Sequence, residues 1–120
     1  PKLELKRGGT TELKMVNFEV NKWVLLPASF EVLDVVAKVL NDHAEFAKVI
    51  IEGHASDEGT KAWNLRLSRK RAQTVMEYLL TKGVKRGRLD YVGFGDTKPS
   101  VPNTTSAGKA QNRRVEIVKR

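Results

Sequence analysis

Residues 49–75 read V-I-I-E-G-H-A-S-D-E-G-T-K-A-W-N-L-R-L-S-R-K-R-A-Q-T-V, and the rest of the chain is interpreted around them. Its start, Val49–Ile51, is a short β-branched run that is typical of a buried strand. The next segment, Gly53–Gly59, combines two glycines, a serine and two acids, which is turn composition. From Thr60 the apolar residues follow helical spacing. A strand therefore leads through a polar loop into a helix, where the unpaired N–H groups of the first turn favour anions.

One arginine in this helix breaks the usual separation of charged and apolar side chains. At about 100° per residue, one stripe collects apolar residues: Leu65, Ala72, Val75, Met76 and Leu79. The opposite face collects polar residues: Arg66, Lys70, Gln73 and Glu77. Arg71 falls beside the apolar stripe, near Asn64 and Ser68. Because an unpaired buried charge is costly, we expect Arg71 to have a partner.

The pattern leaves two interpretations of Arg71 open. In the first, the side chain extends along the apolar surface to solvent, or it forms an internal ion pair. In the second, the guanidinium binds the carboxylate of a ligand, since its fork of N–H groups matches two oxygens at once.

Length and composition indicate one ordinary domain with a single core. The chain has 120 residues and no cysteine, which excludes a disulfide framework and a thiolate metal site. No apolar run approaches the length of a membrane span, and no signal peptide is recognisable. The sequence begins at Pro1 rather than at a methionine, which suggests a fragment of a longer precursor.

The net charge of +8 favours an acidic partner, such as nucleic acid, an anionic membrane or a carboxylate-rich polymer. The basic residues are dispersed, however, so a solvated surface explains them equally simply. Binding of nucleic acid would require basic clusters beside exposed aromatic side chains. Most aromatic residues here occupy core-like positions, apart from Trp23 and Trp63, so we expect no nucleic-acid partner.

The rest of the chain supplies further strands and a second helix. We expect residues 1–12 to form a tail or edge segment and residues 13–120 to form the domain. Alternation predicts a first strand over Leu13–Phe18. A helix should then run from Pro27, a favourable first-turn residue, to about His43, with Ser29 as a candidate cap.

After the second helix, which should end near Thr81, Gly83 is placed as its C-cap. Alternating residues predict a third strand at Leu89–Phe94, a long loop at Gly95–Gly108 and a last strand at Arg114–Lys119. The last strand follows a loop without a helix, so it should be antiparallel to its neighbour. The order β-α-β-α-β-β predicts an α/β fold, an α+β sandwich with helices packed on a mixed four-stranded sheet.

Four blocks of the sequence together resemble the OmpA-like domain, the carboxy-terminal module of OmpA, Pal and MotB relatives. They are G-H-x-x-x-E-G-T from Gly53, N-L-x-L-S-x-x-R-A-x-x-V from Asn64, G-F-G-D-x-x-P from Gly93 and N-R-R-V-E from Asn112. The resemblance covers residues 16–119. It implies the same β-α-β-α-β-β order that the periodicity predicts.

The resemblance implies non-covalent binding of peptidoglycan, through the diaminopimelate of its stem peptide. It further implies a periplasmic module that anchors an outer-membrane or envelope protein to the cell wall, with other envelope proteins as further partners. The membrane anchor would lie in a part of the protein outside this sequence. In the family, the aspartate of a G-H-T-D motif holds the ammonium of diaminopimelate, and the arginine of L-S-x-x-R-A holds a carboxylate. That arginine matches Arg71, which favours the ligand-binding interpretation of this residue.

The acidic half of the family motif differs in this chain. The family aspartate falls on Ser56 and the preceding threonine on Ala55, while Asp57 comes one position later. A serine hydroxyl cannot neutralise an ammonium. Three outcomes stay open: Asp57 replaces the aspartate, Glu58 does so at longer reach, or the site has lost diaminopimelate and the domain is a scaffold for protein–protein interaction.

Other residues of these motifs are candidates for supporting roles. The resemblance suggests that Asn64 supports the loop and that Trp63 walls the pocket or packs under the helix start. His54 is expected to be hydrogen-bonded within the loop, and Arg113 to contact ligand or to hold the last strand.

Neither a metal site nor an active site is predicted. The two histidines are not spaced with other ligands as a zinc site requires, and no cofactor is indicated. Asp57 and Glu58 are adjacent on a turn, and such neighbours rarely present the opposed geometry of a glycosidase pair. The sequence contains no nucleophile elbow or phosphate-binding glycine loop, so we expect a binding protein and not an enzyme.

Overall fold

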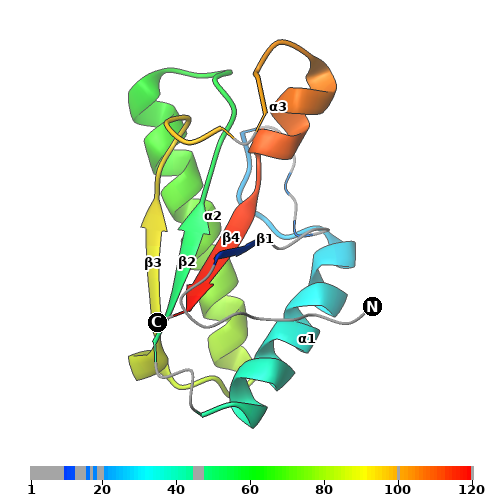
Figure 1. Cartoon of the computed structure of the whole chain (residues 1–120), viewed down its shortest axis with the longest axis vertical. Coiled ribbons are helices and arrows are strands. Elements are labelled where there is room, and N and C mark those ends of the chain that lie inside the picture. Colours follow the sequence, from blue (N-terminus) through cyan, green and yellow to red (C-terminus); the bar gives the residue numbers. More distant parts are fainter. Residues whose placement is uncertain are drawn as a thin grey trace.

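The computed structural model describes residues 10–12, 16, 18, 21–44, 48–99 and 101–119. Its elements follow in chain order: β1 (Thr10–Glu12), α1 (Pro27–Asp42), β2 (Val49–Gly53), α2 (Lys61–Thr81), a 3₁₀ turn η1 (Arg86–Arg88), β3 (Leu89–Gly93), α3 (Ser106–Asn112) and β4 (Val115–Lys119). Figure 1 shows the long helices α1 and α2 beside the sheet, with α3 beyond one end of it.

The four strands form one mixed sheet in the order β1-β4-β2-β3. β2 and β3 are parallel, whereas β4 is antiparallel to both β2 and β1. Ile51 of β2 lies opposite Tyr91 of β3 and Ile117 of β4. The predicted four-stranded mixed sheet and its antiparallel last strand are therefore confirmed.

Both long helices share one hydrophobic core with a single face of the sheet. Burial alternates along β2, so Val49 and Ile51 face the core while Ile50 and Glu52 face the other side. The core joins residues of both helices and three strands: Leu33, Val36, Leu40, Val49, Ile51, Val75, Leu79, Leu89, Val115 and Ile117. Full burial of each such aliphatic side chain contributes about 1.5–3 kcal/mol.

Two glycines bring α2 unusually close to the sheet. A Cβ atom on Gly53 would lie 1.9 Å from the carbonyl oxygen of Ser68, and one on Gly93 would lie 2.4 Å from the backbone nitrogen of Arg69. No larger residue fits between these backbones without a shift of the helix. The close approach fixes the middle of α2, including Arg71, above the carboxyl ends of the two parallel strands.

The termini of the two long helices follow the sequence closely, with one exception. α2 begins after Thr60, whose hydroxyl accepts a 3.1 Å hydrogen bond from the N–H of Trp63. It ends before Gly83, which adopts the expected left-handed conformation with φ 91°. The prediction of Ser29 as a cap is wrong. α1 has Leu26 as N-cap without a side-chain hydrogen bond, and Ser29 is buried inside the first turn.

Three other predictions differ from the structure. Leu65, placed in the apolar stripe, is 50% exposed, whereas the stripe continues through the buried Leu67. The expected loop to Gly108 ends early, since α3 begins at Ser106 and is capped by the hydroxyl of Thr105. Val16 and Phe18 are buried but lie in no strand, and the other residues of the predicted first strand lie outside the described residues.

The strand that the structure does describe near the amino terminus, β1, lies at the edge of the sheet within the predicted edge segment. Among the described residues, none of the helices has the length and apolar character needed to cross a lipid bilayer.

Candidate functional site

A small pocket lies where the loop after β2 meets α2. A water-sized sphere has about 10 Å³ of room inside it, and the whole space between its walls, with the open solvent at its mouth included, is about 200 Å³. Its walls come from four parts of the chain: Asn21, Ala55, Ser56, Glu58, Asn64, Leu67, Arg71 and Arg113. The sequence-predicted Arg71, Ser56, Ala55, Asn64 and Arg113 are therefore brought together around one cavity.

Arg71 is the largest fully buried side chain of the described residues, with 0% exposure. Its Nε donates a 2.9 Å hydrogen bond to the carbonyl oxygen of Lys22, and its guanidinium carbon lies 5.2 Å from the ring centroid of Phe18. Burial, and then the positive charge of Arg113, lower the pKa of Arg71 to about 10, while Glu58 raises it. The guanidinium therefore remains charged at neutral pH inside the pocket wall.

Glu58 supplies the carboxylate of the pocket. Its Oε1 accepts a 2.6 Å hydrogen bond from the hydroxyl of Ser56 and pairs with Nη1 of Arg113. The hydrogen bond from Ser56 lowers the pKa of Glu58, and the charge of Arg113 lowers it further. Both contacts use the same oxygen, Oε1.

Asp57 lies apart from this arrangement. Its carboxylate is 3.6 Å from Nζ of Lys109 on α3, its side chain is 48% exposed, and it does not line the pocket. A direct role of Asp57 in ligand binding stays a prediction, and in this conformation its side chain is turned toward Lys109.

Asn64 and Trp63 hold two walls of the pocket in place. The Asn64 amide accepts a 3.2 Å hydrogen bond from the N–H of Gly59 and donates one of 3.1 Å to the Gly59 carbonyl. The same amide nitrogen lies 3.3 Å from Oδ2 of Asp96. Trp63 donates its indole N–H to Oδ1 of Asn21, which has a positive φ of 60°. These contacts tie both the Gly59 loop and the segment before α1 to the start of α2.

Asn112 and Arg113 are adjacent in the chain but have different structural roles. Asn112 is fully buried, and its side-chain oxygen accepts a hydrogen bond from the N–H of Val101. Its side-chain nitrogen donates to the Val101 carbonyl and to Oδ1 of Asn103. It therefore holds the loop that precedes α3. Arg113 instead lines the pocket and pairs with Glu58, which gives the pocket two guanidinium groups and one carboxylate.

His54 lies just outside the pocket. Its backbone N–H donates to the Arg114 carbonyl at 2.9 Å, and its ring stacks on Phe94 with 5.5 Å between the centroids. Burial and the charge of Arg114 lower the pKa of His54 to about 4, so the ring is neutral at pH 7. Any support that His54 gives to the pocket comes through the backbone, since its side chain is not part of the lining.

Comparison with known proteins places the chain in a family. The family model described as "OmpA family" matches residues 17–113, a range that contains every residue of the pocket. The chain belongs to the OmpA family. The family resemblance seen in the sequence motifs is therefore confirmed.

Within the OmpA family, several curated relatives match most of this chain, among them the next two. The peptidoglycan-binding protein ArfA of Mycobacterium tuberculosis is 40% identical over 78% of the chain and 28% of its own length. The peptidoglycan-associated lipoprotein of Pseudomonas aeruginosa is 36% identical over 85% of the chain and 60% of its own length. The chain thus spans less than two thirds of the length of these relatives.

Solved structures of the OmpA family share the fold. The peptidoglycan-associated lipoprotein of Burkholderia pseudomallei superimposes with a TM-score of 0.82 and 30% identity, over 88% of each chain. This agreement confirms the α/β architecture predicted from the sequence.

Sequence reasoning missed three parts of the site. The Lys22 carbonyl, Asn21 and Leu67 all contribute to the surroundings of Arg71. A backbone carbonyl carries no side-chain signal. Asn21 did carry one, because asparagine is enriched among non-glycine residues with positive φ.

Proposed function

We propose that this domain binds peptidoglycan non-covalently, through the diaminopimelate of the stem peptide. The observation that carries the proposal is the fully buried, charged Arg71 in the wall of a pocket that also contains the Glu58 carboxylate. The free end of diaminopimelate has one ammonium and one carboxylate, which complement such a pair of charges. The names of the two curated relatives, peptidoglycan-binding protein and peptidoglycan-associated lipoprotein, support the same ligand.

In this proposal, Arg71 binds the carboxylate of diaminopimelate. Its guanidinium is oriented in advance by the Lys22 carbonyl and the Phe18 ring, so little side-chain entropy is lost on binding. Arg113 adds a second positive charge at the same pocket. A charge-assisted, two-pronged contact of this kind is among the stronger hydrogen-bonding interactions in proteins.

We further propose that Glu58, and not Asp57, takes the place of the missing family aspartate. Glu58 lines the pocket, whereas Asp57 is directed to Lys109. Ser56 occupies the position of the family aspartate, and its hydroxyl donates a hydrogen bond to Glu58. This bond fixes the Glu58 carboxylate, which would supply the negative charge that a serine lacks. The ammonium of the ligand would then bind at Oε2 of Glu58.

The pocket supports binding without bond cleavage. Glycoside hydrolysis requires two carboxylates on opposite sides of the scissile bond, about 5–9.5 Å apart. The pocket lining contains one carboxylate, and that group is already bound to Ser56 and Arg113. We assign the protein to the periplasmic side of the envelope, where it would anchor an outer-membrane or other envelope protein to the wall.

Sedimentation with purified peptidoglycan sacculi tests the proposal. The domain should pellet with sacculi and be released by free diaminopimelic acid, and Arg71→Ala should stay in the supernatant. Arg66→Ala is the matched control, since Arg66 is exposed on the same helix. Failure of the wild-type domain to pellet would overturn the proposal and favour a scaffold that contacts other envelope proteins.

A further inference from the structure

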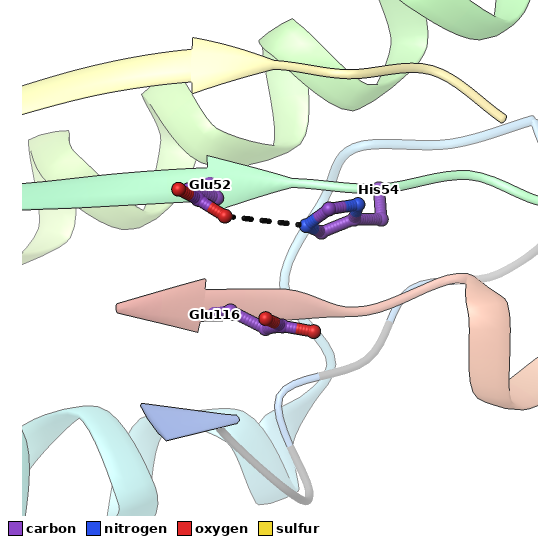
Figure 2. Close-up of side chains that lie close together, drawn as sticks. All are labelled: Glu52, His54 and Glu116. Atoms are coloured by element: carbon purple, nitrogen blue, oxygen red, sulfur yellow. Dashed lines mark ion pairs between the residues drawn. The ribbon is translucent and has the colours of Figure 1, made fainter. Parts of the chain in front are cut away.

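A second cluster of polar side chains lies outside the pocket, at the carboxyl end of β2. Figure 2 shows Glu52, His54 and Glu116 close together, two from β2 and its extension and one from β4. Glu52 and Glu116 are direct partners in the antiparallel pairing of these strands. His54 follows Glu52 by two residues, so both side chains lie on the same side of the strand.

The three side chains are spaced as ligands of one metal ion. Each offers one ligand atom, and these atoms all lie within 4.8 Å of one another. Nε2 of His54 is 3.6 Å from Oε1 of Glu52. Zinc binds nitrogen and oxygen at about 2.0–2.2 Å in a tetrahedron, which places neighbouring ligand atoms about 3.3–3.6 Å apart. Small rotations of the carboxylates would therefore complete the coordination.

The His54 ring gives the independent indication of a ligand. It is 1% exposed, and neither ring nitrogen has a hydrogen-bond partner among the described residues. Buried polar groups in folded proteins nearly always have a partner, so such a ring calls for an explanation. In Figure 2 its Nε2 is directed toward the Glu52 carboxylate.

We propose that Glu52, His54 and Glu116 bind a divalent transition-metal ion, with Zn²⁺ as the class that best fits one imidazole and two carboxylates. Three protein ligands leave one coordination position for water. The sequence spacing does not predict this site, because Glu116 comes close to Glu52 and His54 only through the pairing of β4 with β2.

The guanidinium of Arg114 contacts the cluster directly. Its Nε pairs with Oε2 of Glu116, and its Nη2 donates to the Lys98 carbonyl at 2.8 Å. The guanidinium therefore holds one oxygen of Glu116 and leaves the other oxygen to the ion. Hydrogen bonds to the outer oxygen of a ligating carboxylate are the usual way in which proteins orient such ligands.

The metal site would be separate from the diaminopimelate pocket, whose lining contains none of the three residues. It would nevertheless fix the start of the pocket loop, because His54 directly precedes Ala55 and Ser56. The ion would also link β2 to β4 at the end of the sheet where the pocket lies.

Calorimetric titration of chelator-treated protein with Zn²⁺ tests the proposal, together with NMR of the histidine ring protons. We expect one ion per chain and changed ring signals for His54. The signals of the exposed His43 should stay in place. Glu52→Gln and Glu116→Gln keep the side-chain volume and should each weaken Zn²⁺ binding by at least about tenfold.

The control variant is His43→Gln, which should bind Zn²⁺ as the wild type does. Far-UV circular dichroism of each variant checks that the fold is kept. The proposal is overturned if the wild type takes up no Zn²⁺, if only His43 signals respond, or if both folded Glu→Gln variants bind with unchanged affinity. None of these outcomes depends on peptidoglycan binding, so failure here leaves the proposed function standing.

Discussion

Nε of Arg71 donates a 2.9 Å hydrogen bond to the carbonyl oxygen of Lys22, a residue 49 positions earlier in the chain. The bond joins the middle of α2 to the segment before α1, whose Asn21 is itself bound by Trp63. One side of the buried guanidinium is thereby fixed by the protein. The orientation of the Arg71 fork toward the pocket is set before a ligand arrives.

Replacement of Arg71 by lysine should weaken binding of a diaminopimelate muropeptide by at least about tenfold, or about 1.4 kcal/mol. Lysine keeps the charge but loses the planar guanidinium, which donates to the Lys22 carbonyl and is proposed to bind two carboxylate oxygens as well. Isothermal titration calorimetry measures the change, with Arg66→Lys as the control on the exposed face. Equal affinities of Arg71→Lys and the wild type would argue against a two-pronged carboxylate contact.

The variants Glu58→Gln and Asp57→Asn separate the two candidate partners of the ligand ammonium. Glu58→Gln should weaken muropeptide binding by about tenfold or more, because a charge-assisted hydrogen bond contributes about 1.5–3 kcal/mol. Asp57→Asn should bind almost as the wild type does, since Asp57 is exposed and directed to Lys109. The opposite ranking in calorimetry would show that the loop rearranges and that Asp57 is the ammonium partner.

Acid should weaken the domain through Glu58. The hydrogen bond from Ser56 and the charge of Arg113 hold its folded-state pKa below the ordinary value of 4.5. Its contribution to stability is therefore present above pH 4.5 and is lost as the pH falls through the lowered pKa. NMR titration of the Glu58 carboxyl should show a higher pKa in Ser56→Ala than in the wild type. An identical pKa in both proteins would mean that the Ser56 hydrogen bond is absent in solution.

Gly53→Ala should destabilise the fold by about 1–3 kcal/mol, the usual cost of overpacking. The added Cβ would lie 1.9 Å from the Ser68 carbonyl oxygen, so α2 would have to move away from the sheet. Gly87→Ala is the matched control, because a Cβ there meets nothing within 4 Å. Urea denaturation should place Gly87→Ala within about 0.5 kcal/mol of the wild type. A similarly small effect of Gly53→Ala would contradict the close helix–sheet contact.

Strong apolar periodicity made most of the fold predictable. α1, α2, β2, β3 and β4 all lie where runs or alternation of apolar residues indicate them. α3 was missed because Ser106–Asn112 has no apolar stripe and contains a glycine, so its start depends on the Thr105 cap instead. Leu65 is exposed because the buried face of α2 runs through Asn64, Leu67 and Ser68, and Leu65 lies beside this face.

The site was predictable only in part. Arg71 was recognisable as a charge beside an apolar stripe, and its full burial agrees with that position. The sequence could not show whether Asp57 or Glu58 lies at the pocket, since this depends on the backbone path of the turn that contains them. In the structure, the Ser56 hydroxyl and Arg113 hold Glu58 at the pocket, while Lys109 on the unpredicted α3 draws Asp57 outward.

The most direct test compares two muropeptides that differ in one group, one with diaminopimelate and one with lysine at the same position. Lysine lacks the side-chain carboxylate that Arg71 is proposed to bind. Calorimetry should show that the wild-type domain prefers the diaminopimelate peptide by at least about tenfold, and that Arg71→Ala loses this preference. Equal binding of both peptides by the wild type, or a preference that survives in Arg71→Ala, would contradict recognition of the carboxylate by Arg71.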